Sequence, residues 1–456
     1  MASNIIDSQL FKDLFGNEAM REVFSDRSLI QKWLDVEAAL ARAEARLGMI
    51  PADAAQEITK KAKVENISLS EMKALIEETV HPFVPAIRCL AKICSEEAAR
   101  YIHWGATTQD IMDTAVVLQV RDAFGLIKDE LAQLKDSLAK QVRRYSGLPM
   151  AGRTHSQHAV PITLGYKLAV WLDELSRHQD RLEDLEERLL VGQFSGAAGT
   201  LASLGERGME VQEYLMEELG LGVPPISWHT ARDRFVEYTM VLSMISGTLH
   251  KIANEVVNLQ KTELSELEEP FHEGKVGSST MPHKRNPMIS EIVCTLGLLV
   301  REIAPTAIAS MVHEHERDMR PWATEWEYLP RISIYTHMML VHTNFIISGL
   351  MVHEERMREN MDLLGGLMLS EKMMLVLAER LGRQEAHEVM YKVCIESFEK
   401  RIPLAQVLES HSEIASSLSR EELEELLRPE SYLGLAQEFA QRVLAGVDPK
   451  QKRRVS

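Results

Sequence analysis

Apolar residues recur three or four positions apart along most of the chain, which is the spacing of a helix with one buried face. Near the amino terminus this apolar stripe consists of Ile30, Trp33, Leu34, Ala38 and Ala41. Ser25 or Asp26 can cap the start of the predicted helix, and Gly48 and Pro51 can end it. We therefore expect one long helix between these two sets of signals.

The middle of the chain carries longer patterns of the same kind, and shorter ones fill residues 365–446. The long patterns cover residues 109–143, 161–190, 233–266, 288–311 and 331–357. Segments such as 240–245 are apolar around too much of the helix for a lone surface helix, so we expect them to pack against other helices, including those of partner subunits. Alternating strand patterns with hairpin turns are not evident. The sequence therefore predicts an all-α fold.

Three polar breaks, rich in glycine or proline, separate the long helical patterns. They cover residues 105–110, 152–158 and 271–287, and the last contains the run GSSTMPHKRNP at residues 277–287. In this run Gly277 frees the backbone to bend, and the two serines supply hydroxyl and N–H groups. A surface turn with incidental charges is the alternative interpretation. The combination of several kinds of chemistry in one short loop favours a functional site.

The composition is that of an ordinary globular protein, with 45% hydrophobic and 26% charged residues. The formal net charge of −17 at pH 7 argues against non-specific nucleic-acid binding, which needs a basic face. An anionic substrate must then be attracted by local positive groups against the field of the whole protein. The loop at residues 277–287 supplies such groups, since His283, Lys284 and Arg285 are consecutive.

Other classes of site find little support in the sequence. The four cysteines form no Cys-x-x-Cys pair, and neither a nucleotide-binding loop nor a metal-ligand cluster is evident, so we expect no cofactor and no metal. The first residues lack the basic and apolar segments of a secretion signal, which favours a cytoplasmic location. The most apolar stretch, 334–352, contains several polar residues and has charged flanks, so we expect a bundle helix and no membrane span.

The run at residues 277–287 resembles the signature loop of the fumarase/aspartase superfamily, which includes adenylosuccinate lyase, argininosuccinate lyase and 3-carboxymuconate cycloisomerase. The three polar breaks resemble its three corresponding regions, in the same order, and the resemblance covers essentially the full length. It implies three helical domains at residues 1–108, 109–357 and 358–456, with the long helices and the signature loop in the central one. It also implies a homotetramer with a helical bundle core, in which each active site collects residues from three subunits.

The reaction implied by this resemblance is elimination β to a carboxylate, without a cofactor. A base removes a proton from the carbon next to the carboxylate, the charge spreads onto that group as an aci-carboxylate, and preorganised donors stabilise it. A separate acid protonates the leaving atom. The resemblance assigns the base to Ser278, whose alkoxide could be stabilised by consecutive N–H groups and nearby cations. Capping of a turn is the alternative role for this serine.

His155 is the candidate acid, because an imidazole has an ordinary pKa near 6.5 and can donate a proton at neutral pH. Its segment, Arg-Thr-His-Ser-Gln-His, resembles Arg-Thr-His-Gly-x-His of adenylosuccinate lyases, in which the first histidine is the acid. Thr154 in the same segment is an expected substrate contact. His158 more simply supports the loop, since two histidines three positions apart lack a third metal ligand.

The resemblance implies further substrate-binding residues. Thr107 and Thr108 precede a helix, and a helix N-terminus is a natural carboxylate site, although capping of that helix is an alternative role. Lys284 and Asn286 are expected to hold a substrate carboxylate or to order the loop. The other expected contacts are His81, His103, Ser279, Arg285 and Arg317.

The likeness to individual branches is mixed. The segments at residues 20–27, 228–234 and 314–317 resemble bacterial 3-carboxymuconate cycloisomerases, but those enzymes have an aromatic or apolar residue where His155 stands. The histidines and Ser278 fit the adenylosuccinate lyase pattern. Three positions on the nucleotide side of that pattern, which would be Gln, Ser and Arg, are here Trp228, Trp322 and Trp326. A phosphate needs a donor or a cation, whereas an indole offers one N–H and a large apolar face, so we expect no nucleotide in the substrate. The three tryptophans either pack in the core or line a smaller pocket.

We therefore predict a lyase that eliminates an amine from an N-substituted aspartate or succinyl-type acid, giving fumarate or a related unsaturated acid. The expected partner is a small anionic di- or tricarboxylate, and oxygen or other leaving groups are also open. The alternatives are a 3-carboxy-cis,cis-muconate cycloisomerase, an adenylosuccinate lyase and, outside the enzymes, a structural relative of the kind represented by crystallins. The presence of both Ser278 and His155 counts against the structural relative.

Overall fold

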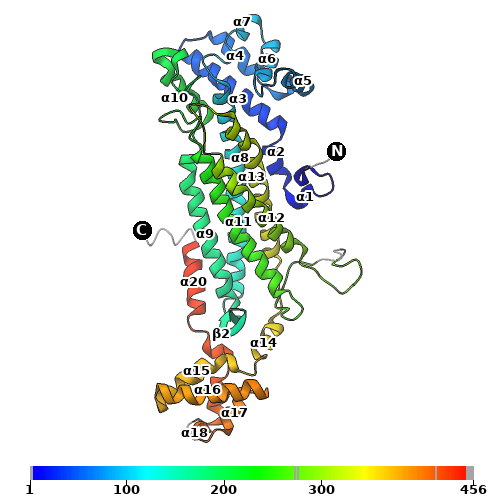
Figure 1. Cartoon of the computed structure of the whole chain (residues 1–456), viewed down its shortest axis with the longest axis vertical. Coiled ribbons are helices and arrows are strands. Elements are labelled where there is room, and N and C mark those ends of the chain that lie inside the picture. The colour runs from blue at the N-terminus through cyan, green and yellow to red at the C-terminus, as the bar shows by residue number, and fades with distance from the viewer. Residues whose placement is uncertain (1–3, 272–273, 275–276, 416–417, 448–456) are drawn as a thin grey trace. The chain divides into compact units, whose positions relative to one another are not determined.

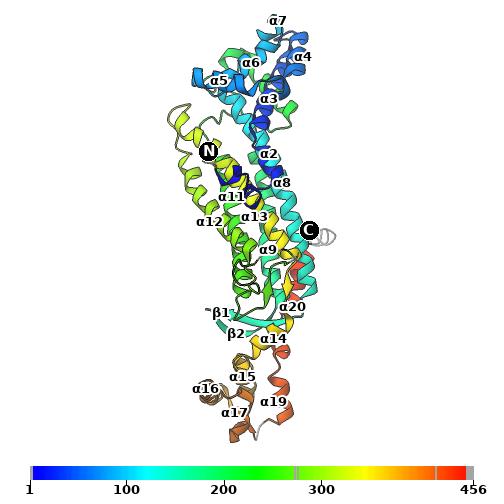
Figure 2. The same cartoon turned by 90° about the vertical axis from the view of Figure 1, so that its right-hand side faces the viewer.

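The computed structural model describes residues 4–271, 274, 277–415 and 418–447, and the chain divides into two compact units. Unit 1 comprises residues 1–131, 178–249 and 295–341, and unit 2 comprises residues 132–177, 250–294 and 342–456. Five long helices each contribute part of their length to both units: α8 (Thr108–Arg144), α9 (Leu164–Leu189), α11 (Asp233–Leu259), α12 (Met288–Ala309) and α13 (Met319–Ser348). Within unit 1 their segments lie side by side (Figures 1 and 2).

The predicted all-α class is confirmed, because shorter helices account for most of the remaining structure. In unit 1 these are α1 (Lys12–Phe15), α2 (Glu18–Val23), α3 (Asp26–Arg46), α4 (Ala52–Lys61), α5 (Leu69–Thr79), α6 (Val84–Ile93), α7 (Glu96–Ala99) and α10 (Gly208–Leu219). In unit 2 they are α14 (Glu354–Asp362), α15 (Ser370–Leu381), α16 (Arg383–Lys400), α17 (Leu404–Ser410), α18 (Ser412–Ala415), α19 (Arg420–Leu426) and α20 (Ala436–Val447). The described strands are β1 (Pro149–Thr154), β2 (Gln157–Thr163), β3 (Leu267–Glu268) and β4 (Met351–Val352).

The helix predicted near the amino terminus is α3, and its ends follow the sequence signals. The Ser25 hydroxyl accepts a hydrogen bond from the Ser28 N–H at 3.1 Å, which satisfies one of the unpaired donors of the first turn. Gly48, just beyond the last turn, has a φ of +67°, a conformation that glycine adopts without a steric penalty. Local sequence therefore decides both ends of this helix.

The last long helix differs from the prediction at both ends. It was expected at residues 331–357, immediately after Pro330, but α13 covers Met319–Ser348 with that proline inside it. A proline inside a helix removes one N–H donor and crowds the preceding turn. Buried side chains on both sides of it, among them Trp322, Leu329 and Ile332, show that tertiary packing keeps the helix continuous.

An antiparallel hairpin of β1 and β2 lies in unit 2, where no strand was expected (Figure 2). Thr154 pairs with Gln157, so His155 and Ser156 form a two-residue turn with φ values of +50° and +64°. Two consecutive positive φ values are the geometry of a tight hairpin turn, for which asparagine and glycine are the usual signals. Their absence here explains why the sequence did not reveal the hairpin, and α9 begins at Leu164 because β2 extends to Thr163.

The carboxyl-terminal helices α15–α19 of unit 2 gather around a core of their own (Figure 1). Met373, Leu377, Val393, Leu404 and Leu408 are all at most 3% exposed in that core. The predicted division into three domains at residues 108 and 357 stays a prediction.

One described helix, α12, is long and apolar enough to cross a membrane by length and composition alone, and a third of that window is buried. A single helix of this kind is weak evidence for a membrane span, because core helices of globular proteins pass the same test.

Candidate active site

Among the described residues, the predicted site residues fall into two sets, one in each unit. Unit 1 holds His81, His103, Thr107, Thr108 and Arg317. Unit 2 holds Thr154, His155, Ser278, Ser279, Lys284, Arg285 and Asn286.

His103 lies in a turn before α8 and has a backbone φ of +61°. Residues other than glycine rarely adopt this conformation, because it costs energy. Glu37 of α3 holds it there with both carboxylate oxygens, at 2.7 Å from the ring Nδ1 and 2.9 Å from the backbone N. Burial opposes protonation of the imidazole, but the attraction of the Glu37 carboxylate outweighs it, so the pKa of His103 is raised. The raised pKa favours a positive charge at an expected substrate contact.

Glu44, two turns further along α3, has no exposed surface and no hydrogen-bond partner for either carboxylate oxygen among the described residues. Burial, and secondarily the negative charge of Glu37, raises the pKa of Glu44 to about 9. The side chain is therefore a neutral carboxylic acid at pH 7, and it adds no negative charge next to the pair of Glu37 and His103.

Asp110, in the first turn of α8, is fully buried and accepts four hydrogen bonds from three segments of unit 1. The donors are the backbone N–H of Thr107 at 3.0 Å, those of Ser195 and Gly196 at 2.9 Å each, and Nε2 of His229 at 2.8 Å. Each carboxylate oxygen takes two of these donors, so both oxygens have hydrogen-bond partners. One side chain thus fixes the start of α8 against the 195–196 loop and the 229 segment.

Arg317 bridges two of the segments that Asp110 holds. Its Nη1 donates to the Thr107 hydroxyl and its Nη2 to the Ala197 carbonyl, both at 2.9 Å. The Arg317 side chain is exposed, and a guanidinium has five N–H donors, so the two bonds leave donors for an anion. Arg317 and Thr107 therefore come together in the structure, beside the N-terminus of α8 at Thr108.

Two of the three tryptophans on the expected nucleotide side are core residues of unit 1. Trp228 and Trp322 are 2% and 4% exposed, and their ring N–H groups donate to the Gly192 carbonyl and to Asp113. Trp326 instead is 38% exposed and lines a cavity of unit 1.

Arg232 is fully buried beside these tryptophans and forms ion pairs with Asp113 and Glu325. Asp113 also accepts a hydrogen bond from Gln109 at 3.1 Å, so its partners are side chains, whereas those of Asp110 are mainly backbone groups.

His81 supports the chain locally. Its Nδ1 accepts hydrogen bonds from the N–H groups of Phe83 and Val84, at 3.2 and 3.0 Å, at the start of α6. The other ring nitrogen is the one left for a ligand.

His155 and Thr154 lie at the exposed tip of the hairpin in unit 2. The His155 side chain makes no hydrogen bond within the described part of the chain, and its backbone is held in the left-handed region by the two-residue turn. His158 lies opposite Arg153 in the strand register at the base of the tip, and the supporting role expected for it stays a prediction.

Gly277 allows the signature loop to close on itself. A Cβ atom at this position would collide with the Lys284 carbonyl and lie 2.9 Å from the Arg285 Cα, so only glycine fits the close approach. The Ser278 hydroxyl follows directly and accepts hydrogen bonds from the N–H groups of Thr280 at 3.3 Å and Met281 at 3.0 Å. The serine thus caps a turn, and the same two donors also point at the oxygen that would carry the charge of an alkoxide.

The other loop residues differ in their contacts. Ser279 and Lys284 are exposed, and the Ser279 hydroxyl contacts that of Thr280 at 3.4 Å. Arg285 donates to Glu268 at 3.1 Å and lies over the ring of Phe271, which holds its charge close to the protein. The Asn286 carbonyl accepts from the Met288 N–H at 2.9 Å.

Three buried glutamates around β3 anchor both the hairpin and the signature loop. Glu266 pairs with Arg153 at the base of the hairpin, at 2.5 and 2.9 Å. Glu268 pairs with Arg285 in the loop. Glu269 accepts the backbone N–H of Ser290 at 2.9 Å, in the first turn of α12 that follows the loop.

The sequence singled out none of the residues that hold this machinery in place, namely Glu37, Asp110, His229, Glu266 and Glu269. Only Asp110 carried a usable signal, because Thr107-x-x-Asp110 has the spacing of a capping box at a helix start. The others act across long sequence separations.

No described contact joins Ser278 to His155. Among the described residues no group of three or more His, Cys, Asp or Glu side chains is placed to hold a metal ion, and the expected absence of metal and cofactor stays a prediction.

Comparisons with known proteins show the family of this chain. A family model described as "Lyase" matches residues 15–301, and one described as "Adenylosuccinate lyase C-terminus" matches residues 366–443. The chain is 42% identical to N-acetyl-S-(2-succino)cysteine lyase of Dickeya dadantii over 98% of both chains, and 43% identical to 3-carboxy-cis,cis-muconate cycloisomerase of Pseudomonas aeruginosa over 97% of both. The crystal structure of the 3-carboxy-cis,cis-muconate lactonizing enzyme of Pseudomonas putida superposes with a TM-score of 0.92 at 41% identity, covering 98% of this chain and all of that one.

The fold and the matched sequence define an enzyme whose relatives are lyases and cycloisomerases. The chain belongs to the fumarase/aspartase superfamily of lyases.

Replacing Asp110 with Asn tests its role as the anchor of the 195–196 loop. The amide cannot accept all four hydrogen bonds, and each buried donor left unpaired costs about 1–3 kcal/mol. We expect lower stability to urea and faster amide hydrogen exchange in the peptide covering residues 193–199. The matched control is Asp113→Asn, an equally buried carboxylate three residues later on α8. It should lower stability without affecting exchange in that peptide; equal exchange in both variants would contradict the anchoring role.

The raised pKa of Glu44 makes stability depend on pH. Between its unfolded value of 4.5 and about 9, the folded state binds a proton that the unfolded state does not, so stability falls as pH rises through this window. Glu44→Gln keeps the size and cannot ionise. The gain in urea midpoint of Glu44→Gln over the wild type should therefore be larger near pH 8 than near pH 6. A gain that is the same at both pH values would show that Glu44 does not titrate in this way.

Proposed function

We propose that this protein catalyses the β-elimination of a heteroatom leaving group from a succinyl-type dicarboxylate and releases fumarate or a close relative. Ser278 is the base that removes the carbon-bound proton, and His155 is the acid that protonates the leaving atom. No cofactor takes part in the proposed reaction. The environment of the Ser278 oxygen carries this proposal.

The Ser278 hydroxyl is a weak base unless its deprotonated form is stabilised. The N–H groups of Thr280 and Met281 donate to its oxygen, and Lys284 lies in the same closed loop. Donors that face the charged form lower the free energy of an alkoxide, which makes proton removal by serine feasible. The turn-capping geometry and the catalytic role are therefore compatible.

The strained turn supports the role of His155. A histidine at a left-handed position in a two-residue turn costs energy, and such strain concentrates at functional sites. The exposed ring is free to meet a substrate, since no described side chain holds it. Thr154, on the same tip, is a further substrate contact in this proposal.

Unit 1 supplies the groups suited to the carboxylates of the substrate. Arg317 has unused N–H donors beside the N-terminus of α8, and Thr107 and Thr108 add hydroxyl groups there. His103 favours its charged form because of Glu37. Positive charge and preorganised donors of this kind are what an aci-carboxylate intermediate requires.

The tryptophans favour a leaving group smaller than a nucleotide. The ring N–H groups of Trp228 and Trp322 are used within the core, so neither can bind a phosphate. The sequence suggests an amine as the leaving group. The name of the Dickeya dadantii relative adds a thiol as the second candidate, since an S-(2-succino)cysteine carries sulfur on the succinyl carbon.

Association into a homotetramer is part of the proposal. Long helices expose large apolar side chains, among them Leu298 at 57% and Ile308 at 54% on α12. Apolar side chains on the faces of long helices favour burial against other helices. The active site in this proposal combines residues of three subunits, and the cytoplasmic location expected from the sequence stays a prediction.

The reverse reaction tests the chemistry. Fumarate is incubated with a panel of amines and thiols, and adducts are detected by mass spectrometry. We expect a succinyl adduct with at least one nucleophile, and at least a 100-fold loss of rate in Ser278→Ala, because that variant lacks the base. A residual rate above about 1% would exclude Ser278 as the base.

The variant His155→Ala distinguishes amine from thiol chemistry in the same assay, because a change in the enzyme alters the rates of addition and elimination by the same factor. An amine leaves only when protonated, so loss of the acid should slow nitrogen elimination by about 100-fold or more. A thiol has an ordinary pKa near 8.5 and can leave as a thiolate, so the loss should be much smaller for sulfur. If no nucleophile gives an adduct, lactone formation from 3-carboxymuconate becomes the reaction to test, as the Pseudomonas relatives suggest.

Mixing two variants that are both expected to be inactive with an amine tests the shared site, with the amine reaction as the readout. Ser278→Ala and His155→Ala subunits are combined, unfolded and refolded together at equal amounts. If the two residues of one site come from different subunits, about a quarter of the sites regain both residues. The control is the double variant Ser278→Ala/His155→Ala mixed with either single variant, which should restore no activity. No recovery in the main mixture would show that one chain supplies both residues.

A further inference from the structure

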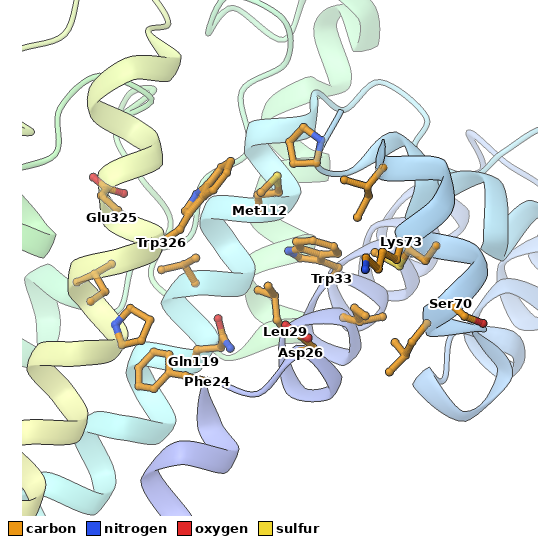
Figure 3. Close-up of a pocket in the computed structure, with 18 residues that line it drawn as sticks. Phe24, Asp26, Leu29, Trp33, Ser70, Lys73, Met112, Gln119, Glu325 and Trp326 are labelled. Atoms are coloured by element: carbon orange, nitrogen blue, oxygen red, sulfur yellow. The ribbon is translucent and has the colours of Figure 1, made fainter. Parts of the chain in front are cut away.

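Unit 1 contains a cavity of about 670 Å³ that includes none of the predicted site residues (Figure 3). Helices α3, α5, α8 and α13 supply most of its walls. Its volume lies within the range of small-molecule pockets, and most of the lining side chains are apolar or aromatic. Ligand sites typically combine such walls with a few polar groups that orient the ligand.

One polar group in the wall is unpaired. The indole N–H of Trp33 is buried, the residue is 5% exposed, and among the described residues this nitrogen has no hydrogen-bond partner. Figure 3 shows the ring nitrogen turned toward the side of the cavity that Met112 and Trp326 line. A buried N–H without a partner costs free energy, so an acceptor that enters the cavity gains a hydrogen bond and relieves this cost.

The remaining polar lining indicates what kind of molecule fits. Gln119 already donates to the Val23 carbonyl, and Glu325 is committed to Arg232. Asp26 and Lys73 are exposed and of opposite charge, so the lining favours neither an anion nor a cation. Because an indole only donates, the ligand must carry an acceptor.

We propose that this cavity binds an uncharged, mainly apolar molecule through a carbonyl or ether oxygen that accepts the Trp33 N–H. None of the residues proposed to carry the elimination lines this cavity. Trp33 also contacts the ring of Phe83 edge-on at 5.5 Å, and Phe83 lies 5.5 Å from the ring of His103. A ligand that binds Trp33 therefore contacts a side chain that is linked through Phe83 to His103, an expected substrate contact.

Two probes of nearly identical shape test the hydrogen bond. 4-Phenyl-2-butanone carries the acceptor, and butylbenzene replaces it with a methylene group. Binding of each to the full-length protein is measured by calorimetric titration, and the ratio of the butylbenzene Kd to the 4-phenyl-2-butanone Kd is compared between variants. Trp33→Phe keeps an aromatic wall without the N–H, so this ratio should fall about fivefold, the typical effect of one hydrogen bond.

The matched control is Trp171→Phe, which changes a tryptophan that is also 5% exposed but lies outside the cavity, and it should leave the ratio unchanged. A second variant, Ile76→Trp, places bulk at the cavity wall on α5 and should weaken both probes by at least about tenfold.

The proposal is overturned if neither probe binds saturably to the wild type, or if Trp33→Phe leaves the ratio unchanged. It is also overturned if binding weakens as the protein concentration rises, since the cavity would then be covered by a second copy of the chain. The readout is binding, so it is independent of whether the proposed elimination is correct.

Discussion

The buried carboxylate of Asp110 is the constraint on which the arrangement of the expected substrate groups in unit 1 depends. A carboxyl group buried away from solvent is costly unless its oxygens are hydrogen-bonded. Here three backbone N–H groups and His229 satisfy it, and these donors belong to three separate segments. The condition that all four donors converge on one group fixes Thr107 relative to the 195–196 loop. Arg317 then bonds to Thr107 and to Ala197, whose relative positions are already fixed by Asp110.

Unit 2 uses the same principle with a different set of partners. Glu266 and Glu268 face arginines, and Glu269 faces the first N–H groups of α12, where the helix dipole favours a negative charge. In a protein with a net charge of −17, these pairs place carboxylates inside and hold cations and donors beside the hairpin and the loop. Both units therefore rely on internal acids to position groups suited to an anionic substrate.

Strain and close approach appear at, or directly beside, residues expected to act on the substrate. His103 and His155 both occupy the left-handed region, and Gly277 permits a contact that no other residue allows. Relatives at 42% and 43% identity are named for different reactions, a thioether lyase and a cycloisomerase. One fold thus serves more than one chemistry, so the fold alone does not set the reaction of a given member.

The sequence by itself determined the all-α class, the ends of α3 and the approximate position of the long helices. These features depend on local signals, such as helical periodicity, the Ser25 cap and the glycine after the last turn, and such signals act within a few residues. The loop at residues 277–287 and its superfamily were also evident, because an eleven-residue run of special residues is specific.

Only the tertiary structure decided the hairpin, the course of α13 through Pro330 and the role of the three tryptophans. The tight turn at His155 and Ser156 lacks the usual asparagine or glycine, so strand pairing imposed it. Trp228 and Trp322 are core residues while Trp326 lines a cavity, although all three look alike in sequence. The supporting acids Glu37, Asp110 and Glu266 meet partners as many as 119 positions away. Contacts over such separations leave no local pattern, because they follow from how the helices pack and not from any one segment.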